Sequence, residues 1–428
     1  MFESFRDSID VSNLKVALIN LGCAKNLVDG ETVISTLIDA GISVCESPED
    51  ADIVIVNTCG FIQSAALESI NVLLELSKSK KVIAIGCLVE RYKQELVKSM
   101  PEVDIFFGTD SAKGLLKLFQ KPQIQIRRNL HTTGVYAYLK ISEGCNRLCS
   151  FCAIPKIRGK HRSRPIEELI KETQMLLSRG AKEICIVSQD TGYYGRDLHD
   201  GTNLSTLLSE LEKLKQKFWI RLFYLYPTDV NEELISTITD SEKILPYFDI
   251  PLQHISDNVL KSMRRGYSKK EIYNLLELIY KKIPHAVIRS TFIVGYPTET
   301  EKDFQELLDF IKEGHITWLG AFGYSPEEGT YAYGLGESVK KREKNARLRA
   351  LYSIQKNITQ RKNRALVGSE IEVLIEGFEG PVLYARSYLN APEVDGTIYI
   401  QSQKDLKPGE FVKVRLRRAK EYDLLADF

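Results

Sequence analysis

The sequence of 428 residues lacks any apolar run of about eighteen residues, and it lacks an excess of either charge. Its 58 Lys and Arg side chains nearly balance 57 Asp and Glu side chains, so charge alone does not indicate a polyanionic partner. No segment is therefore predicted to span a membrane. Residues 1–13 are polar and carry acids, unlike a signal peptide. We predict a cytoplasmic protein whose eight cysteines stay reduced.

A fourth cysteine is missing from the stretch ISEGCNRLCSFCAIP, which holds Cys145, Cys149 and Cys152 at C-x₃-C-x₂-C spacing. Structural zinc normally takes four closed ligands, often from paired C-x₂-C knuckles, and only His161 is nearby as a fourth. An iron–sulfur cluster is normally held by four thiolates, so three would leave one iron open to a small molecule. The spacing favours a cluster over zinc.

The chain is long enough for two or three domains. The apolar runs KVALINL, ADIVIVN, KVIAIG and DIFFG alternate with helical patterns, which predicts an N-terminal open parallel α/β sheet. Six later runs predict a central partial (β/α)6 barrel: YAYLKIS, EICIVS, WIRLFYL, YFDIPL, AVIRSTFIVG and WLGAFGY. Short strands with Gly and Pro turns then predict a small antiparallel β-barrel. The expected segments are 1–128, 129–338, a basic connecting helix at 339–366, and 367–428.

Three further cysteines each close an apolar strand of the N-terminal domain: Cys23 in INLGC, Cys59 in VNTCG and Cys87 in AIGCL. The carboxyl ends of parallel strands line one crevice, so these thiols are predicted to meet at one edge of the sheet. Chance placement is the alternative, because cysteine is often a buried core residue. Cys45 and Cys185 lie inside apolar runs and are predicted to be such core residues.

The C-x₃-C-x₂-C motif after the first barrel strand resembles the radical S-adenosylmethionine superfamily. The resemblance implies that the methionine moiety of S-adenosylmethionine chelates the open iron, and that one electron cleaves it to a 5′-deoxyadenosyl radical. With the upstream cysteines and the small C-terminal barrel, called a TRAM domain, nearly the whole chain resembles the methylthiotransferases. That family binds a second cluster through residues equivalent to Cys23, Cys59 and Cys87. The implied cofactors are two [4Fe–4S] clusters and S-adenosylmethionine.

The stretch LGCAKNLVDGE is similar to the ribosomal-protein branch of that family, known as RimO, which typically reads Gly-Cys-Pro-Lys-Asn. The tRNA branch typically reads Gly-Cys-Gln-Met-Asn. Ala24 occupies a position where the family usually has proline, and Gly30 one where it usually has serine. In a later stretch, IVGYPTETEKDF, Thr298 occupies a position where the family commonly has glycine. The resemblance implies methylthiolation of an aspartate β-carbon in small-subunit ribosomal protein twelve, free or in the assembled subunit. It also implies an external electron donor and a sulfur donor, and we expect a monomer.

Two other functions remain open from the sequence. One is a tRNA adenosine methylthiotransferase, similar to MiaB. The other is a non-catalytic metal-binding RNA adaptor, which would hold zinc and would not turn over S-adenosylmethionine.

Charge is unevenly placed near the C-terminus. The segment from Lys340 to Arg364 contains ten Lys and Arg side chains and a single acid, Glu343. The helix predicted here is therefore either solvated on its basic face or in contact with ribosomal RNA. The next segment is acidic, with Arg386 as its one base, which predicts either a solvated face or a docking surface for a basic protein. Its acids are Glu370, Glu372, Glu376, Glu379, Glu393 and Asp395.

Several barrel residues are candidates for the cofactor crevice. Phe151 is expected near the adenine, as the equivalent aromatic of the family is. Gly295 either permits close approach to the cofactor or is a plain turn glycine. Polar residues after two of the barrel strands are expected to point toward the crevice: Gln189, Asp190, Gln253 and His254. Of these, His254 is either a structural or an active-site residue. No catalytic acid or base is assigned, because hydrogen-atom abstraction by a carbon radical requires neither.

Overall fold

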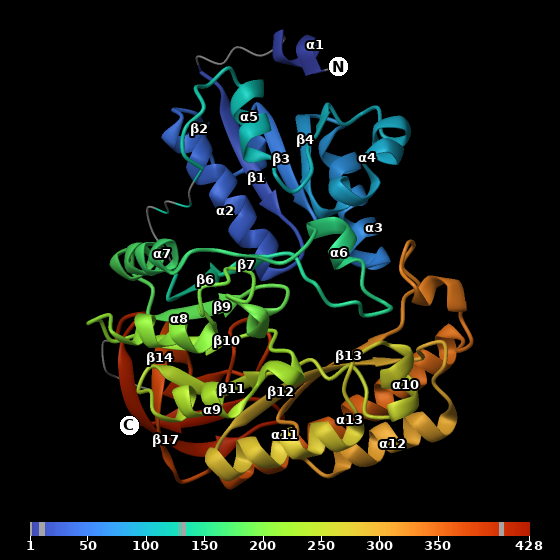
Figure 1. Cartoon of the computed structure of the whole chain (residues 1–428). Helices are drawn as coiled ribbons and strands as arrows, with labels where there is room; N and C mark the ends of the chain where they lie inside the picture. The colour runs from blue at the N-terminus through green and yellow to red at the C-terminus, as the bar shows by residue number, and fades with distance from the viewer. Residues whose placement is uncertain (1, 8–12, 127, 129, 131–133, 402–405) are drawn as a thin grey trace. The chain divides into compact units, whose positions relative to one another are not determined.

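The computed structural model describes residues 2–7, 13–126, 128, 130, 134–401 and 406–428 (Figure 1). The chain forms two compact units, the first made of residues 1–131, 143–146 and 153–161, and the second of residues 132–142, 147–152 and 162–428. The cysteine-rich loop is therefore divided, with Cys145 in the first unit and Cys149 and Cys152 in the second. The predicted domain boundary at residue 129 lies outside the described residues.

The first unit contains a five-stranded parallel sheet in the order β2-β1-β3-β4-β5, which confirms the predicted open parallel α/β domain. Its strands are β1 (Lys15–Asn20), β2 (Ser43–Val44), β3 (Ile53–Thr58), β4 (Lys81–Gly86) and β5 (Ile105–Phe106). Its helices are α1 (Phe2–Asp7), α2 (Ala24–Asp39), η1 (Pro48–Asp50), α3 (Gln63–Leu76), α4 (Cys87–Ser99), α5 (Ala112–Leu118) and α6 (Ile154–Arg158). The edge strand β2 was not predicted because Ser43 is exposed and Val44 is half-buried, so they form no apolar run, whereas the equally short β5 is buried and lies within the predicted run DIFFG.

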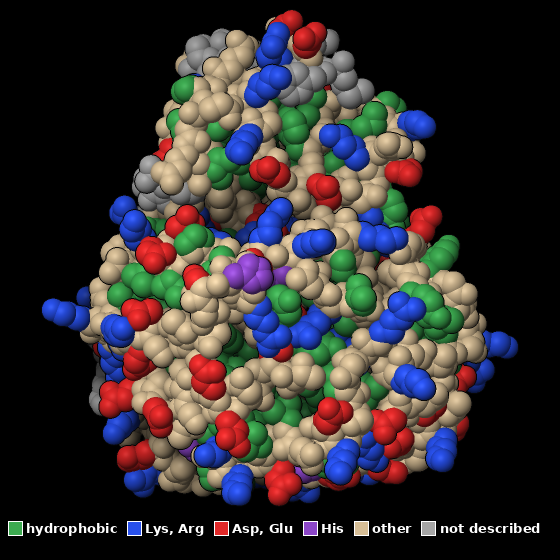
Figure 2. All heavy atoms as spheres, viewed as in Figure 1, with side chains coloured by type: hydrophobic (Ala, Val, Ile, Leu, Met, Phe, Trp, Pro, Cys, Tyr) green, Lys and Arg blue, Asp and Glu red, His purple; other side chains and the backbone are tan. Residues whose placement is uncertain are grey.

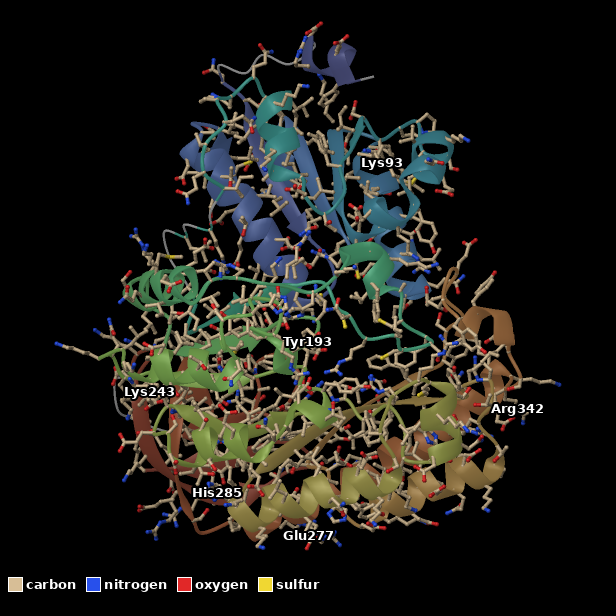
Figure 3. The ribbon with its side chains drawn as sticks, in the orientation of Figure 1. Lys93, Tyr193, Lys243, Glu277, His285 and Arg342 are labelled. Atoms are coloured by element: carbon tan, nitrogen blue, oxygen red, sulfur yellow. The ribbon has the colours of Figure 1, made fainter. Side chains whose placement is uncertain are left out.

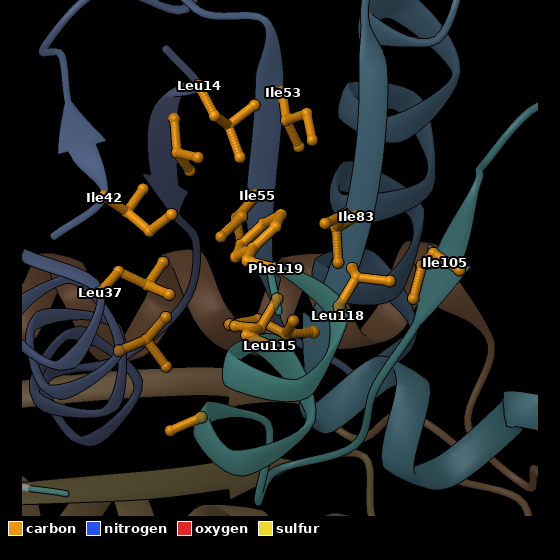
Figure 4. Packing of buried hydrophobic residues seen from close by; sticks show 14 of the residues in the cluster. Leu14, Leu37, Ile42, Ile53, Ile55, Ile83, Ile105, Leu115, Leu118 and Phe119 are labelled. Atoms are coloured by element: carbon orange, nitrogen blue, oxygen red, sulfur yellow. The ribbon is translucent and has the colours of Figure 1, made fainter. Parts of the chain in front are cut away.

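Helices cover both faces of this sheet because successive strand residues point to opposite sides. In β3, Ile53 and Ile55 pack in one core with residues of α2 and α5 (Figure 4). Their neighbours Val54 and Val56 pack in a second core with residues of α3 and α4. The continuous apolar runs of the sequence are thus explained by burial on both faces.

The second unit contains a six-stranded parallel sheet in the order β13-β12-β11-β10-β9-β6, which confirms the six predicted strands of the partial barrel. The strands are β6 (Tyr136–Lys140), β9 (Glu183–Val187), β10 (Trp219–Leu222), β11 (Ile244–Asp249), β12 (Val287–Val294) and β13 (Trp318–Gly323). The helices between them are α7 (Ile166–Ser178), η2 (Thr191–Tyr193), α8 (Leu204–Glu212), η3 (Pro227–Asp229), α9 (Glu232–Thr239), α10 (Asp257–Ser262), α11 (Lys269–Lys282) and α12 (Glu301–Lys312). A separate two-stranded pair is formed by β7 (Ser142–Glu143) and β8 (Arg162–Ser163).

The chain after β13 forms η4 (Ala332–Leu335), the long helix α13 (Lys341–Ala365) and a closed β-barrel. The barrel confirms the predicted C-terminal fold, and its strands are β14 (Glu370–Glu379), β15 (Val382–Arg386), β16 (Ile398–Gln401), β17 (Phe411–Ala419) and β18 (Leu424–Asp427). Helix α13 is not simply a solvated basic face, because Lys344 and Arg347 are buried. Arg347 forms ion pairs with Glu299 and Glu301.

Charges of both signs are mixed over the face drawn in Figure 2, as the near balance of the composition leads us to expect. Among the helices formed by the described residues, none is both long and apolar enough to cross a membrane.

A buried ion-pair network joins the parallel sheet to the C-terminal barrel within the second unit. Glu183 in β9 accepts hydrogen bonds of 2.6 Å from both Arg221 in β10 and Arg386 in β15. The Glu183 side chain is 0% exposed. Burial alone would raise the pKa of Glu183, but the two guanidinium groups outweigh it and lower the pKa. The Glu183 carboxylate therefore lies between two buried cations, of which Arg386 also pairs with Glu376 (2.7 Å).

Replacing this carboxylate is expected to destabilise the second unit. Glu183→Gln takes the anion from the buried Arg221 guanidinium and leaves Arg386 with its second pair, to Glu376, and breaking a buried pair of this kind typically costs about 3–5 kcal/mol. Glu370→Gln is the matched control, because Glu370 pairs with Arg415 on the surface and such pairs contribute only about 0–1 kcal/mol. Thermal unfolding of both variants measures the difference. A melting temperature for Glu183→Gln no lower than that of Glu370→Gln would contradict the role of the network.

Candidate functional site

Cys23, Cys59 and Cys87 lie at the carboxyl edge of neighbouring parallel strands in the first unit. Cys59 directly follows β3, and Cys87 directly follows β4 as the first residue of α4. Cys23 follows β1 and is the N-cap residue of α2. The prediction that these cysteines meet at one edge of the sheet is confirmed, whereas their role as metal ligands stays a prediction.

Gly22 lets the loop that carries Cys23 approach Cys59 closely. Its φ is +92°, a left-handed conformation that favours glycine. A Cβ atom at this position would lie 2.7 Å from the Cβ and 2.9 Å from the Sγ of Cys59. Any larger residue would therefore displace the Cys59 side chain or the loop.

The surroundings of the three thiols shift their pKa values in different directions. Burial would raise the pKa of Cys23, but the Lys25 charge and the backbone N–H groups of Asn26 and Lys25 outweigh it and lower the pKa. These donors belong to the first turn of α2, where a helix favours negative charge. Burial raises the pKa of Cys59. It also raises the pKa of Cys87 to about 11, against the opposing charge of Arg158.

Ser150 fixes the second half of the cysteine-rich loop within the second unit. Its backbone N–H donates to the Met263 carbonyl (3.0 Å), and its carbonyl accepts from the Ala332 N–H (2.7 Å). Its hydroxyl donates to the Ser262 carbonyl (2.9 Å) and lies 2.7 Å from the Tyr296 hydroxyl. Cys149 and Cys152, on either side of Ser150 and Phe151, are therefore held on a tightly bonded turn.

A buried arginine donates to one sulfur of this loop. Arg265 Nη1 lies 3.1 Å from Cys149 Sγ, and Arg265 also donates to the Tyr267 hydroxyl (2.8 Å) and the Pro251 carbonyl (2.8 Å). These contacts fix the guanidinium against the Cys149 sulfur within the second unit.

The carboxyl end of the barrel also carries an alternating network of arginines and aspartates. Arg147, between Cys145 and Cys149 in sequence, donates to Asp190 Oδ2 (2.7 Å) and to Asp229 Oδ2. Arg196 donates to the other oxygen of Asp229 (2.7 Å). The Arg147 guanidinium lies 3.8 Å from the ring centre of Tyr226, and Arg196 lies over Tyr193, which is labelled in Figure 3. Burial raises the pKa of Asp190 even though Arg147 opposes it.

The structure places the other predicted crevice residues near the ends of barrel strands. Phe151 packs against a buried cluster that includes Met263, Tyr296 and Ala332. Gln189 follows β9 in the same turn as Asp190. Gln253 follows β11, has a left-handed φ of +69°, and donates its backbone N–H to the Thr291 carbonyl (2.8 Å). Their contact with a cofactor stays a prediction.

Two of the candidates have structural explanations. Gly295 has a φ of +71°, donates its N–H to Glu299 Oε2 (2.5 Å), and leaves space that the stem of Lys344 fills. His254 is 0% exposed, and its Nδ1 accepts from the Ser256 N–H (3.0 Å). Burial lowers the pKa of His254 to about 3, so this imidazole is neutral at physiological pH.

The predicted acidic surface of the C-terminal barrel requires correction, because most of its acids are paired within the chain. Asp395 is buried and accepts from the Tyr247 hydroxyl (2.6 Å). The other pairs join Glu370 to Arg415, Glu372 to Lys217, Glu376 to Arg386 and Glu393 to Tyr136. These residues do not form one solvated acidic face, so they do not support a docking surface for a basic protein.

Sequence reasoning missed the arginines of both sites. Arg147 stands within the quoted cysteine motif, and Arg158 follows its last residue by three positions and donates to Cys87 Sγ (3.0 and 3.2 Å) in the first unit. Their closeness in sequence to the cysteines was a signal, but nothing in the sequence indicates which side chains they contact. Among the described residues, no three His, Cys, Asp or Glu side chains gather around a point that could hold a single metal ion. A cluster does not require such a point, because each of its cysteines binds a different iron.

Comparisons with known proteins match each part of the chain. Residues 15–108 match the uncharacterized protein family UPF0004, residues 139–311 the radical SAM superfamily, and residues 367–428 the TRAM domain. The ribosomal protein uS12 methylthiotransferase RimO of Aquifex aeolicus is 55% identical over 416 residues, which cover 96% of each chain. The chain belongs to the ribosomal protein uS12 methylthiotransferase family. A second member, from Sulfurihydrogenibium sp., is 48% identical over 97% of this chain and 100% of its own length.

Membership in this family makes the chain a radical S-adenosylmethionine methylthiotransferase. The superfamily implies a [4Fe–4S] cluster and S-adenosylmethionine. The fold agrees: a radical S-adenosylmethionine methyltransferase, TsrM from Kitasatospora setae, aligns with a TM-score of 0.56 at 14% identity, over 72% of this chain and 73% of that one. Neither of the two relatives above is named as a tRNA-modifying enzyme or an RNA adaptor.

Proposed function

We propose that this protein attaches a methylthio group to the β-carbon of an aspartate in small-subunit ribosomal protein uS12. The observation that carries the proposal is the 55% identity to a uS12 methylthiotransferase across 96% of both chains. The cysteine positions agree with it, because two groups of three occur, one at strand ends and one on a single loop. We propose that each group holds one [4Fe–4S] cluster, two in all.

The residues of both groups fit such a role. Cys23, Cys59 and Cys87 are free thiols at one sheet edge, and thiolates are the usual ligands of iron–sulfur clusters. In the second group, Arg265 donates to Cys149 Sγ (3.1 Å), and the bonds of Ser150 hold the loop in place. When bound, the cluster and S-adenosylmethionine supply one-electron cleavage and radical chemistry. The chain's own residues bind and orient these groups, and the apolar cluster around Phe151 excludes water on one side.

Other parts of the proposal follow from the same assignment. The cluster of Cys145, Cys149 and Cys152 would bind S-adenosylmethionine beside Phe151, Gln189, Gln253 and Gly295. The cluster of Cys23, Cys59 and Cys87 would hold or deliver sulfur. We propose three domains at 1–128, 129–338 and 367–428, a monomer acting in the cytoplasm, and an external electron donor and sulfur donor.

Crowding Cys59 is expected to remove one cluster without touching a ligand. Gly22→Ala places a Cβ against the Cys59 side chain, so iron should fall from about eight to about four per chain. Gly41→Ala is the matched control, because Gly41 also has a positive φ of +77° but its Cβ would contact only the Lys121 Nζ at 4.0 Å. The control shares the backbone strain and lacks the clash. Equal iron contents in the two variants would argue against a cluster at this edge.

The proposed substrate is tested with the purified, reconstituted protein, S-adenosylmethionine, a reductant and a sulfide source. Purified uS12 and bulk tRNA are offered separately, and both are analysed by mass spectrometry. We expect a methylthio group on one aspartate of uS12 and none on tRNA. Modification of tRNA in place of uS12 would overturn the proposal and favour the tRNA-modifying alternative.

A further inference from the structure

Arg158 contacts a predicted cluster ligand with two donors. Its Nε lies 3.2 Å and its Nη2 lies 3.0 Å from the Sγ of Cys87, so the guanidinium binds the sulfur in bidentate fashion. Ala153 and Ile157, on the same segment, pack against the Cys87 side chain. All of these residues belong to the first unit.

The guanidinium is held in place by three further groups. Its Nη1 donates to Asp29 (2.5 Å) and Glu143 (3.3 Å), and its Nη2 donates to Asn26 Oδ1 (3.0 Å). Asp29 and Asn26 lie on α2, the helix that Cys23 caps. Arg158 is 5% exposed, so water screens its charge weakly. The arginine therefore stands as a fixed positive charge at the edge where the three cysteines meet.

A fixed cation against a cluster sulfur has a defined electronic consequence. Hydrogen bonds to the sulfurs and the local charge set the reduction potential of an iron–sulfur cluster. Reduction adds negative charge, which a bidentate guanidinium stabilises more in the reduced form than in the oxidised form. A cluster bound beside Arg158 should therefore have a higher potential than the same cluster without it.

Arg158 lies close in sequence to the cysteines of the other proposed cluster. It follows Cys152, a ligand of the other proposed cluster, by six residues. Cys152 belongs to the second unit, whereas residues 153–161 belong to the first. The segment that leaves one cluster loop thus supplies the cation for the other cluster.

We infer that Arg158 is a positioning residue for the second cluster: it orients the Cys87 sulfur and raises the reduction potential of the cluster held by Cys23, Cys59 and Cys87. The inference rests on the proposed second cluster.

The test uses the full chain with Cys145, Cys149 and Cys152 replaced by alanine, so that the strand-end cluster is observed alone. In this parent we compare Arg158→Gln, which removes the charge, and Arg158→Lys, which keeps the charge but not the bidentate geometry. Arg128→Gln is the matched control, because Arg128 is a buried arginine of the same unit that pairs with Glu31 (2.5 Å). Iron content and a redox titration followed by electron paramagnetic resonance are measured for each protein.

We expect Arg158→Gln to lower the ratio of reduced to oxidised cluster at least tenfold at a fixed potential, a shift of about 59 mV for one electron. Arg158→Lys should lower the ratio of reduced to oxidised cluster less than Arg158→Gln does. Arg128→Gln should leave this ratio unchanged. A merely structural arginine would change stability without changing this ratio in the folded, iron-loaded protein. An unchanged ratio in iron-loaded Arg158→Gln would overturn the inference, and Arg158→Ala, which also removes the charge, decides in the same way if the glutamine variant does not fold. A parent that binds no iron would instead overturn the second cluster itself, and the inference with it.

Discussion

Replacing Cys145, Cys149 and Cys152 together by alanine is expected to halve the iron content and to abolish reductive cleavage of S-adenosylmethionine. Two clusters contribute about eight irons per chain, and this change removes the ligands of one. Cys23, Cys59 and Cys87, which follow β1, β3 and β4 of the first unit, are unchanged in this variant, so about four irons should remain. Iron analysis and chromatography of the cleavage products measure both effects.

A control separates loss of ligands from damage to the loop. Ser150→Ala removes the hydroxyl contacts to Ser262 and Tyr296 but keeps every cysteine, so iron should stay near that of the unchanged protein. An unchanged iron content in the triple alanine variant would show that this loop holds no cluster.

Replacing Cys23, Cys59 and Cys87 by alanine is expected to separate the two activities. Cleavage of S-adenosylmethionine should remain measurable, because the residues proposed to support it lie on the other loop and on the barrel strands. Transfer of sulfur to uS12 should be lost, because the strand-end cysteines are proposed to hold or deliver it. Cleavage is measured without uS12, and sulfur transfer is measured by mass spectrometry of uS12.

Cys45 and Cys185 provide the matched control for this variant. Cys185 is buried in β9, and Cys45 lies beside the edge strand β2. Neither lies in the predicted cluster sites, so Cys45→Ala with Cys185→Ala should preserve both activities. If the variant with Cys23, Cys59 and Cys87 replaced by alanine still attached sulfur to uS12, these cysteines of the first unit would have no role in sulfur transfer.

The fold was largely predictable because its signals are local. Apolar runs on both faces of a parallel sheet indicate strands, and the residue that follows such a run lies at the carboxyl edge by necessity. The places of Cys59 and Cys87 were therefore set by the strands before them. The strand β2 escaped prediction because its residues, Ser43 and Val44, are not fully buried and form no apolar run, unlike those of the equally short β5.

The site was only partly predictable because its electrostatics depend on residues distant in sequence. Arg158 and Cys87 are 71 residues apart, and Arg147 and Asp229 are 82 apart. The acidic segment was misinterpreted for the same reason: Glu372 is paired with Lys217, 155 residues away. A single sequence shows where charges occur along the chain but not which of them neutralise one another.

The central claim is that uS12 is the substrate, and the most direct test is mass spectrometry of uS12 from cells with and without the gene for this protein. We predict that one aspartate of uS12 carries a methylthio group in the parent cells, that this group is absent when the gene is deleted, and that it returns when the gene is restored. A restored gene with Cys145, Cys149 and Cys152 changed to alanine should not return it. Persistence of the group on uS12 after deletion, or loss of a methylthio group from tRNA alone, would contradict the account.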